Sequence, residues 1–491
     1  MKRLIIHFII IIFLTINLAN LKNLTLIDWD EGVFALQSGW IGSLGGEGKP
    51  FNFQTPPLFQ ILIALVFRLL GAKDWILPLI SIIFSALTIY ILFLFGKELY
   101  AEKIAIFSVI LFISTEYFLF FSKSGLSDAT FLFFFITALY FYYQGLMTGL
   151  TKNFLFSGIF TTLACYTKYT GPILILIFLI TGFLRRGQFK KSHFFFVIIL
   201  PILLFLPYLI IFAKVVTVTG IIQRHGRLLG INHLKFLFYL VRFAPLVFFT
   251  AIFYRIKDER DYFLLTSLVV FFFILGFYYH YFRLAYPLIP LFSLFSASFL
   301  YKFKKIRYYL LGLMFATNVV LGFDTIFYHS NVPKILGERA RTFIKENNVK
   351  YVFAATPPNI IFYLGNKILI PEDHPGSKIL ADKIKFFKKQ VLIRKDENLL
   401  KDHDCILFIF FTIFDTLKAE LNSITINGKL LGTIEFVDAP VYYKDLFNPL
   451  KGKKQIYEIY LLSIKDLDSQ SLRKLWELVF KPEITFLQIA N

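Results

Sequence analysis

The chain has 491 residues, of which 57% are hydrophobic and only 17% are charged, and 63 of them are phenylalanine. A soluble protein of this length does not need so large a share of apolar side chains, so the composition excludes an ordinary soluble enzyme. It favours a protein that crosses a membrane several times. The formal net charge of +20 points to nucleic acid or to anionic lipid as a partner.

The positive charge lies in short clusters between hydrophobic runs. This is the positive-inside pattern of cytoplasmic loops and not the basic face of a nucleic-acid groove. We therefore expect membrane lipids, and no nucleic acid, as partners. The clusters are Arg185, Arg186, Lys190 and Lys191; Arg255, Lys257 and Arg260; and Lys302, Lys304, Lys305 and Arg307.

Hydrophobic runs follow one another along the first two thirds of the chain. A transmembrane helix needs ~20 apolar residues, or fewer where it is packed against others, and by this criterion we predict about eleven spans. The first run follows Met1-Lys2-Arg3 without a small-residue cleavage site, so we expect an uncleaved anchor with a cytoplasmic N-terminus. The runs are Leu4–Leu18, Trp75–Phe95, Ile104–Phe121, Ala129–Leu146, Phe154–Tyr166, Pro172–Leu184, Phe194–Ala213, Phe236–Tyr254, Tyr262–Tyr279, Leu284–Leu300 and Tyr308–Phe327.

Counting from a cytoplasmic N-terminus places all three basic clusters on the cytoplasmic side, as the positive-inside rule requires. The count holds only if the segment Pro57–Leu70 does not span the membrane. That segment is short, opens with Pro56-Pro57 and carries Arg68, so we expect a helix that lies along the membrane interface. The prediction is a multi-pass protein of the cell membrane, with everything after Tyr328 outside the cytoplasm.

The last third of the chain differs in composition and pattern from the first two thirds: charges are frequent, and strand-like runs alternate with helical ones. We therefore expect a transmembrane domain over residues 1–327 and an extracytoplasmic soluble α/β domain over residues 328–491. The fold class is a polytopic α-helical membrane protein with a C-terminal α/β domain. The predicted strands are Tyr351–Ala355, Lys367–Ile370, Cys405–Phe411, Leu431–Val437 and Gln455–Ile464.

An acidic cluster follows the first hydrophobic run, in Ile27-Asp28-Trp29-Asp30-Glu31-Gly32. Carboxylates near a bilayer are costly to bury and do not help a chain to span it, so this cluster indicates chemistry. A solvated acidic loop is the plain alternative. Asp28-Trp29-Asp30 also resembles a short metal-binding DxD pattern, which leaves a divalent cation as an open cofactor.

The predicted topology gathers further polar side chains on the same outer side. Carboxylates together with cations suit a reaction at an anionic lipid headgroup, with a carboxylate as general base and the cations holding phosphate. Asp128 could instead cap its helix, Lys168 and Arg283 could extend to the interface, and His280 could be a packing residue. The gathered residues are Asp28, Asp30, Glu31, Lys123, Asp128, Lys168, Arg224, Arg227, His280 and Arg283.

Five motifs in chain order resemble the GT-C membrane glycosyltransferases, within the protein O-mannosyltransferase and aminoarabinose-transferase branch. The resemblance covers roughly Leu4 to Phe327. The motifs are Asp30-Glu31-Gly32-Val33-Phe34-Ala35; Thr55-Pro56-Pro57-Leu58; Gly71-Ala72-Lys73-Asp74-Trp75; Ser124-Gly125-Leu126-Ser127-Asp128; and Tyr286-Pro287-Leu288-Ile289-Pro290.

The resemblance implies a role for several of these residues. Asp30 would be the catalytic carboxylate, Glu31 its companion and Asp128 a second acidic group, and the donor would be a sugar on a polyprenyl or dolichyl phosphate. Many relatives carry Lys or His where this chain has Thr55. Contact with the donor phosphate is then expected from Lys168 and Arg283, with His280 and Thr55 as further candidates and Tyr286 as a neighbouring landmark.

The expected function is therefore an inverting glycosyltransferase that moves the sugar to a hydroxyl of a lipid, glycan or protein acceptor. A transporter or lipid flippase is the alternative, but it predicts charges near mid-span and paired inverted halves, and neither pattern is evident. A non-catalytic relative that only binds envelope partners is a third interpretation. No HExxH, Walker, GxSxG or CxxC motif occurs, which disfavours protease, ATPase and redox functions.

Overall fold

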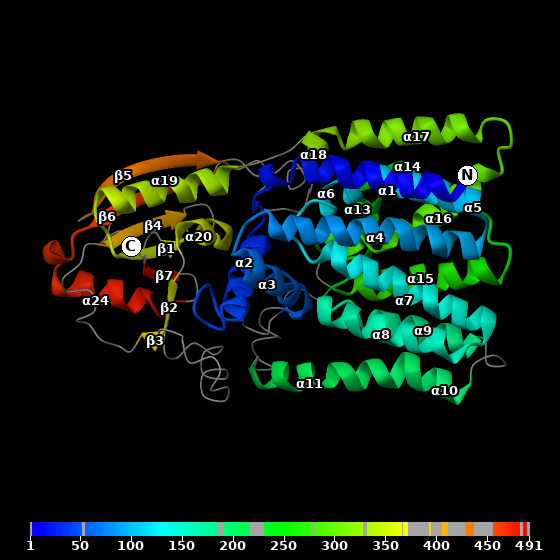
Figure 1. Cartoon of the computed structure of the whole chain (residues 1–491), viewed down its shortest axis with the longest axis horizontal. Helices are drawn as coiled ribbons and strands as arrows, with labels where there is room; N and C mark the ends of the chain where they lie inside the picture. Colours follow the sequence, from blue (N-terminus) through cyan, green and yellow to red (C-terminus); the bar gives the residue numbers. More distant parts are fainter. Residues whose placement is uncertain are drawn as a thin grey trace. The chain divides into compact units, whose positions relative to one another are not determined.

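The computed structural model divides into two compact units (Figure 1), and it describes residues 2–51, 55–184, 190–215, 230–278, 280–327, 331–365, 367–371, 392–393, 405–410, 424, 428–436, 455–481 and 485–488. The helical unit contains Met1–Leu21, Phe53–Phe59 and Pro78–Tyr328. The sheet unit contains Lys22–Asn52, Gln60–Leu77 and His329–Asn491.

The helical unit is a bundle whose long helices run side by side along one direction in Figure 1. Each helix begins and ends close to a hydrophobic run of the sequence. The elements are α1 (Lys2–Ala19), α4 (Ile76–Leu99), α5 (Glu102–Ser114), α6 (Glu116–Phe121), α7 (Asp128–Thr148), α8 (Thr151–Thr167), α9 (Ile173–Leu184), α10 (Lys191–Phe194), the π-helix η3 (Phe195–Ile199), α11 (Leu200–Val215), α13 (His233–Phe243), α14 (Pro245–Ile252), α15 (Glu259–Gly276), η5 (Phe282–Ala285), α16 (Leu288–Tyr301), α17 (Arg307–Leu321) and α18 (Phe323–Phe327).

Aromatic side chains fill the interior of this bundle. The rings of Tyr142 and Phe178 stack with centroids 4.2 Å apart, and those of Phe135 and Phe271 meet edge to face at 5.1 Å. Each buried ring removes a large apolar area from water or lipid headgroups, so ring pairs of this kind stabilise the contacts between helices. The high phenylalanine content is therefore used in contacts between helices as well as on their outer surfaces.

Three helices of the described part are long and apolar enough to cross a membrane by themselves: Ile76–Leu99, Asp128–Thr148 and Lys191–Ile211. Five shorter apolar helices of 10–17 residues accompany them. Every predicted run contains a helix or a short series of helices. The predicted total of about eleven spans stays a prediction.

Two predicted runs are not continuous helices. In Phe236–Tyr254, α13 and α14 meet at a bend of 113°. Pro245 begins α14, and a proline disfavours helical backbone at the preceding residue, which here is Ala244 with φ −149° and ψ 51°. In Ile104–Phe121, the extended backbone of Thr115 separates α5 from α6, and its hydroxyl accepts a hydrogen bond from the Phe118 amide. Each of these two predicted runs therefore contains two helices separated by a break.

A seven-stranded sheet forms the centre of the second unit, in the order β3-β2-β7-β1-β4-β6-β5. The pairs β1–β4 and β2–β3 are parallel, whereas β7 runs antiparallel to both β1 and β2. The strands are β1 (Tyr351–Ala355), β2 (Lys367–Pro371), β3 (Leu392–Ile393), β4 (Cys405–Phe410), β5 (Lys429–Phe436), β6 (Gln455–Leu462) and β7 (Thr485–Gln488). The five predicted strands are confirmed, and β3 and β7 were not predicted.

Helices from both ends of the chain belong to this sheet unit. They are α2 (Trp29–Gly42), most of α3 (Leu58–Leu70), α19 (Val332–Glu346), α20 (Pro358–Leu364) and α24 (Ser469–Leu478). Leu36 of α2 is buried in the same apolar cluster as Val352 and Phe353 of β1. The unit that contains the sheet is thus larger than the predicted domain 328–491, because two N-terminal segments pack into it.

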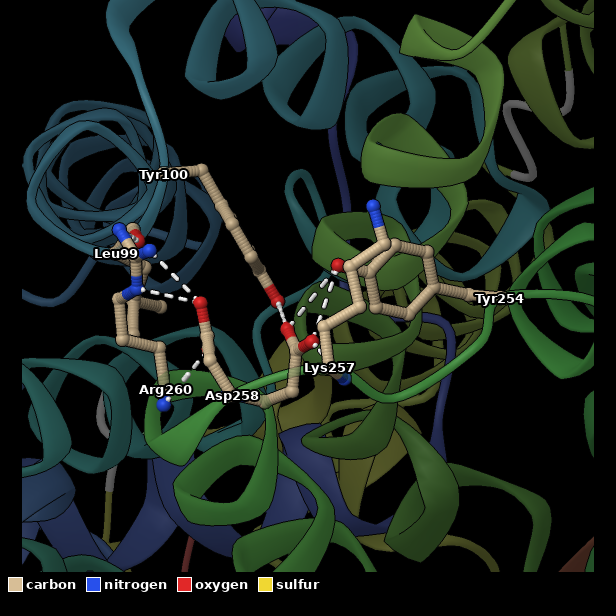
Figure 2. Close-up of polar contacts among 7 residues, drawn as sticks. Leu99, Tyr100, Tyr254, Lys257, Asp258 and Arg260 are labelled. Atoms are coloured by element: carbon tan, nitrogen blue, oxygen red, sulfur yellow. Dashed lines mark hydrogen bonds and ion pairs between the residues drawn. The ribbon is translucent and has the colours of Figure 1, made fainter.

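A polar network lies where α4 ends and α15 begins (Figure 2). The buried Asp261 carboxylate accepts hydrogen bonds from the Tyr100 hydroxyl at 2.7 Å, the Tyr254 hydroxyl at 3.1 Å and the Lys257 amide at 2.8 Å. Asp258 caps α15 and binds the Arg260 guanidinium, which also donates to the Leu99 carbonyl at 3.0 Å. These hydrogen bonds fasten the end of α4 to the start of α15.

Candidate functional site

The acidic cluster of the sequence forms the first turn of α2. Asp28 is the N-cap residue and accepts a hydrogen bond from the Asp30 amide at 2.7 Å. The Glu31 carboxylate turns back and accepts one from the Asp28 amide at 3.0 Å, which completes a capping box. Asp28 and Glu31 are 7% and 2% exposed. Asp30 lies between them and is partly exposed. Two of the three carboxylates therefore shape the start of the helix.

Helix α20 holds the residues just before this cap. The Asn359 side-chain amide donates to the Ile27 carbonyl at 2.9 Å, and the Tyr363 hydroxyl accepts from the Leu26 amide at 3.0 Å. Gly32 faces the same helix so closely that a Cβ there would lie 1.9 Å from the Asn359 nitrogen. Gly32 is thus required by the contact of α2 with α20. Asn359 and Tyr363 were not predicted, because nothing in their local sequence refers to a segment more than 330 residues earlier.

Asp74, from the third sequence motif, joins the same arrangement. It accepts a hydrogen bond from the Tyr363 hydroxyl at 3.1 Å and pairs with the Lys334 ammonium of α19 at 3.2 Å. Burial, with a further contribution from the nearby Asp74, raises the pKa of Tyr363, so its hydroxyl stays a donor at physiological pH. The motifs around Asp30 and Asp74 are therefore linked through one tyrosine.

In the helical unit the structure brings Asp128 and Lys168 together. Asp128 opens α7, Lys168 follows the end of α8, and the ammonium lies 2.5 Å from the carboxylate Oδ1. The Asp128 side chain is buried at 2% exposure, and the Lys168 side chain is partly buried at 13%. Among the described residues, none donates a hydrogen bond to the Asp128 Oδ2 atom. The N-cap residue of α7 is Ser127, whose side chain makes no capping bond, so capping does not explain Asp128.

Lys123 does not join this pair. Its ammonium donates to the carbonyls of Thr325 at 2.8 Å and Ile326 at 2.7 Å, in α18. Burial lowers the pKa of Lys123 to about 8. Glu116 lies near the same helix, where it accepts from the Thr325 hydroxyl at 2.8 Å and pairs with Arg242 at 3.6 Å.

The remaining predicted residues each have their own set of contacts. His280 has the Lys235 ammonium 3.3 Å from its Nδ1 atom, and the Arg283 guanidinium lies over the Tyr281 ring at 4.7 Å. Tyr286 is buried, interacts electrostatically with Asp128 and stacks on Tyr117 at 5.9 Å. The other positions are Thr55, in a bend shortly before α3, and Arg224 and Arg227, which lie outside the described residues.

Within the described part of the chain, no three His, Cys, Asp or Glu side chains gather closely enough to hold a metal ion. The divalent cation therefore stays an expectation from the DxD pattern. The predicted assignments of Asp30, Glu31 and Asp128 as catalytic residues, and of Lys168, Arg283, His280 and Thr55 as contacts of the donor phosphate, stay predictions as well.

Residues 54–211 match the family model described as dolichyl-phosphate-mannose-protein mannosyltransferase. No curated protein matches the chain. The apo structure of ArnT from Cupriavidus metallidurans superimposes with a TM-score of 0.64 at 13% identity, over 94% of this chain and 99% of that one.

Two further structures are similar. ArnT of the same organism bound to undecaprenyl phosphate gives a TM-score of 0.60 at 11% identity, over 94% of this chain and 98% of that one. The apo oligosaccharyltransferase of Archaeoglobus fulgidus gives 0.51 at 13% identity, over 77% and 63% of the two chains. The predicted fold class, a helical membrane protein with a C-terminal sheet region, is confirmed. Residues 54–211 therefore match the sequence model of that mannosyltransferase family, and the chain as a whole shares the fold of ArnT.

Proposed function

We propose that this protein transfers a sugar from a polyprenyl-phosphate donor to the hydroxyl group of an acceptor, with inversion at the anomeric carbon. The observation that carries the proposal is the similarity over 94% of the chain to a structure that binds undecaprenyl phosphate. The match of residues 54–211 to a family named for a dolichyl-phosphate sugar donor supports the same donor class.

Asp30 is the proposed general base. The acceptor oxygen forms a bond to the anomeric carbon while the bond from that carbon to the phosphate oxygen breaks. The electron pair of that bond stays on the lipid phosphate, and the acceptor proton passes to the Asp30 carboxylate. Asp30 is the least buried of the three carboxylates, which makes it the preferred base.

The leaving phosphate needs positive charge, and Lys168 and Arg283 are the proposed sources. Lys168 is fixed by Asp128, so its ammonium is held in place before the donor arrives. Preorganised charge of this kind lowers the barrier because it does not have to be reoriented during the reaction. Asp128 in this proposal positions Lys168 and balances its charge while the site is empty.

The first experiment incubates the purified protein with a panel of polyprenyl-phosphate sugars and an acceptor mixture, and follows release of lipid phosphate. We expect Asp30→Asn to lower turnover by about 100-fold or more, the scale of a lost general base. Glu47→Gln is the matched control, since Glu47 is an exposed carboxylate of the same N-terminal segment. Full activity of Asp30→Asn would refute the assignment of the base.

The same assay separates the alternative function. Proteoliposomes that move a lipid-linked sugar across the bilayer without forming a glycosidic product would support a transporter or flippase instead. A second arm contains a chelator. If turnover falls with chelator and returns with added Mg²⁺ or Mn²⁺, a divalent cation takes part in the reaction.

The proposed side of the reaction is the outer face of the cell membrane, with the acceptor being a lipid, a glycan or a protein. The distribution of the basic clusters in the sequence supports this orientation, because the positive-inside rule favours an outer position for the acidic first turn of α2. Labelling of single cysteines placed at Glu47 and Lys304 with a membrane-impermeant reagent tests this orientation. Reaction at Glu47 and protection at Lys304 are expected in intact cells.

A further inference from the structure

Helix α20 holds the backbone that leads into α2 at two consecutive residues. Asn359 donates to the Ile27 carbonyl, and Tyr363 accepts from the Leu26 amide, at 2.9 Å and 3.0 Å. Both partners are main-chain groups, so the contacts fix the path of the chain whatever side chains it carries. The path they fix is the one that ends at the capping box of Asp28 and Glu31.

The Tyr363 hydroxyl is the centre of a buried network. It accepts from one segment and donates to another, since its proton goes to Asp74 at 3.1 Å. Asp74 is held in turn by Lys334 of α19 at 3.2 Å. Tyr363 is only 8% exposed. Loss of the hydroxyl would remove one hydrogen-bond partner from both the Leu26 amide and the Asp74 carboxylate, because the hydroxyl binds both. Buried hydrogen bonds in one network also reinforce one another, so the loss affects more than a single contact.

Helices α2 and α20 are packed so closely that neither can shift toward the other. A Cβ at Gly32 would lie 1.9 Å from the Asn359 nitrogen and 2.3 Å from the Pro358 carbonyl carbon, so the two backbones are in direct contact. The rotation of α2 about its axis is therefore set by α20. Asp30 lies in the same turn as Gly32, so the rotation of α2 also sets the direction in which Asp30 leaves the helix.

We propose that Asn359 and Tyr363 are positioning residues for Asp30, so that the C-terminal part of the chain orients the base for sugar transfer. The proposal rests on the function proposed above. Neither residue touches the reacting atoms in this scheme. Catalytic groups must be held to about 0.5 Å, and a displacement of about 1 Å costs on the order of 100-fold in rate. The hold on Leu26 and Ile27 supplies that rigidity.

Two nearly isosteric variants test the proposal. Tyr363→Phe removes only the hydroxyl, and Asn359→Asp keeps the oxygen that accepts from the Ile360 amide but cannot donate to Ile27. Tyr460→Phe is the matched control, because it removes a tyrosine hydroxyl elsewhere in the sheet unit, where its partner is Glu458. We expect each test variant to lower kcat by about 10- to 100-fold with an unchanged KM for the donor.

Two further readouts separate positioning from a general structural role. In the Asp30→Asn background, Tyr363→Phe should cause no further loss, because the group that it positions is already absent. Hydrogen exchange of the peptide that contains Leu26 and Ile27 should increase in Tyr363→Phe and stay unchanged in Tyr460→Phe. The exchange measurement does not depend on activity.

Faster exchange together with unchanged kcat would overturn the positioning role while leaving the proposed function intact. A loss of activity as large in the Asp30→Asn background as in the wild type would also overturn it, since the effect would then not act through Asp30. A wild-type protein that is inactive with every donor would overturn the proposed function, and the positioning role with it.

Discussion

Asp128 and Asp261 are both buried carboxylates near the start of a helix of the helical unit, but their surroundings differ. Asp261 accepts hydrogen bonds on both oxygens, from two tyrosine hydroxyls and a backbone amide. Asp128 has the Lys168 ammonium at Oδ1 and no hydrogen-bond donor at Oδ2 among the described residues. A satisfied buried carboxylate holds a structure together, whereas an incompletely satisfied one indicates a group kept for a ligand or a reaction.

The comparison is sharpest when the same substitution is made at both positions. Asp128→Asn should lower turnover by about 100-fold or more, because the Lys168 ammonium is then no longer held in place at the proposed phosphate site. Asp261→Asn should lower the free energy of unfolding by about 1.5–3 kcal/mol, the range of hydrogen bonds to a charged group, and leave the turnover of folded protein within about threefold. Turnover with a polyprenyl-phosphate sugar and thermal unfolding in detergent measure the two effects. If the two variants were equally active, the proposed difference between a functional Asp128 and a structural Asp261 would be refuted.

The ion pair itself predicts a difference between single and double variants. Lys168→Met leaves the Asp128 carboxylate buried and unpaired, which should cost about 3–5 kcal/mol of stability. The double variant with Asp128→Leu should recover most of that loss, since no charge remains buried, but it should not recover activity. Thermal unfolding of the three proteins in one detergent checks the first part. Recovery of turnover in the double variant would show that the pair has only a structural role.

Lys123 offers a test through pH, because its partners are carbonyl groups and not a carboxylate. Burial lowers its pKa to about 8, below the model-peptide value of 10.5. The unfolded chain therefore binds more protons than the folded one between pH 8 and 10.5, and stability rises across that window. The rise should be about 1–2 kcal/mol, since each pKa unit corresponds to ~1.4 kcal/mol and partial solvation reduces it. Lys123→Met should abolish the rise, and an identical pH profile in both proteins would contradict the assignment.

Asp258 should show the smallest effect. Its partial burial acts to raise the pKa of the carboxyl, but hydrogen bonds from Arg260 and the backbone of α15 outweigh it and hold the pKa below its usual value. A carboxyl with a depressed pKa stabilises the fold above its ordinary pKa, and this contribution is lost as the pH falls through the folded value. Asp258→Asn keeps the cap but removes the charge. It should cost less than about 1 kcal/mol at pH 7, with a difference that disappears in acid.

Much of the fold could be predicted because its signals are local. Runs of apolar residues mark α4, α7 and α11, and alternation with turn residues marks β1, β4 and β6. The acidic first turn of α2 was found for the same reason, since Asp28, Asp30 and Glu31 are neighbours in the chain. Strand β7 was missed because it is only four residues long, yet it lies between β1 and β2.

The sequence by itself determined most of the helical segments, five of the seven strands of the described sheet, and which short stretches carry unusual charge, because hydropathy and side-chain periodicity act over a few residues. Only the tertiary structure decided the partners of those charges. It pairs Asp128 with Lys168 across 40 residues, and it places Asn359 and Tyr363 against Leu26 and Ile27 across more than 330. Such contacts depend on how whole helices pack, and no local pattern encodes the side chain that another helix will present.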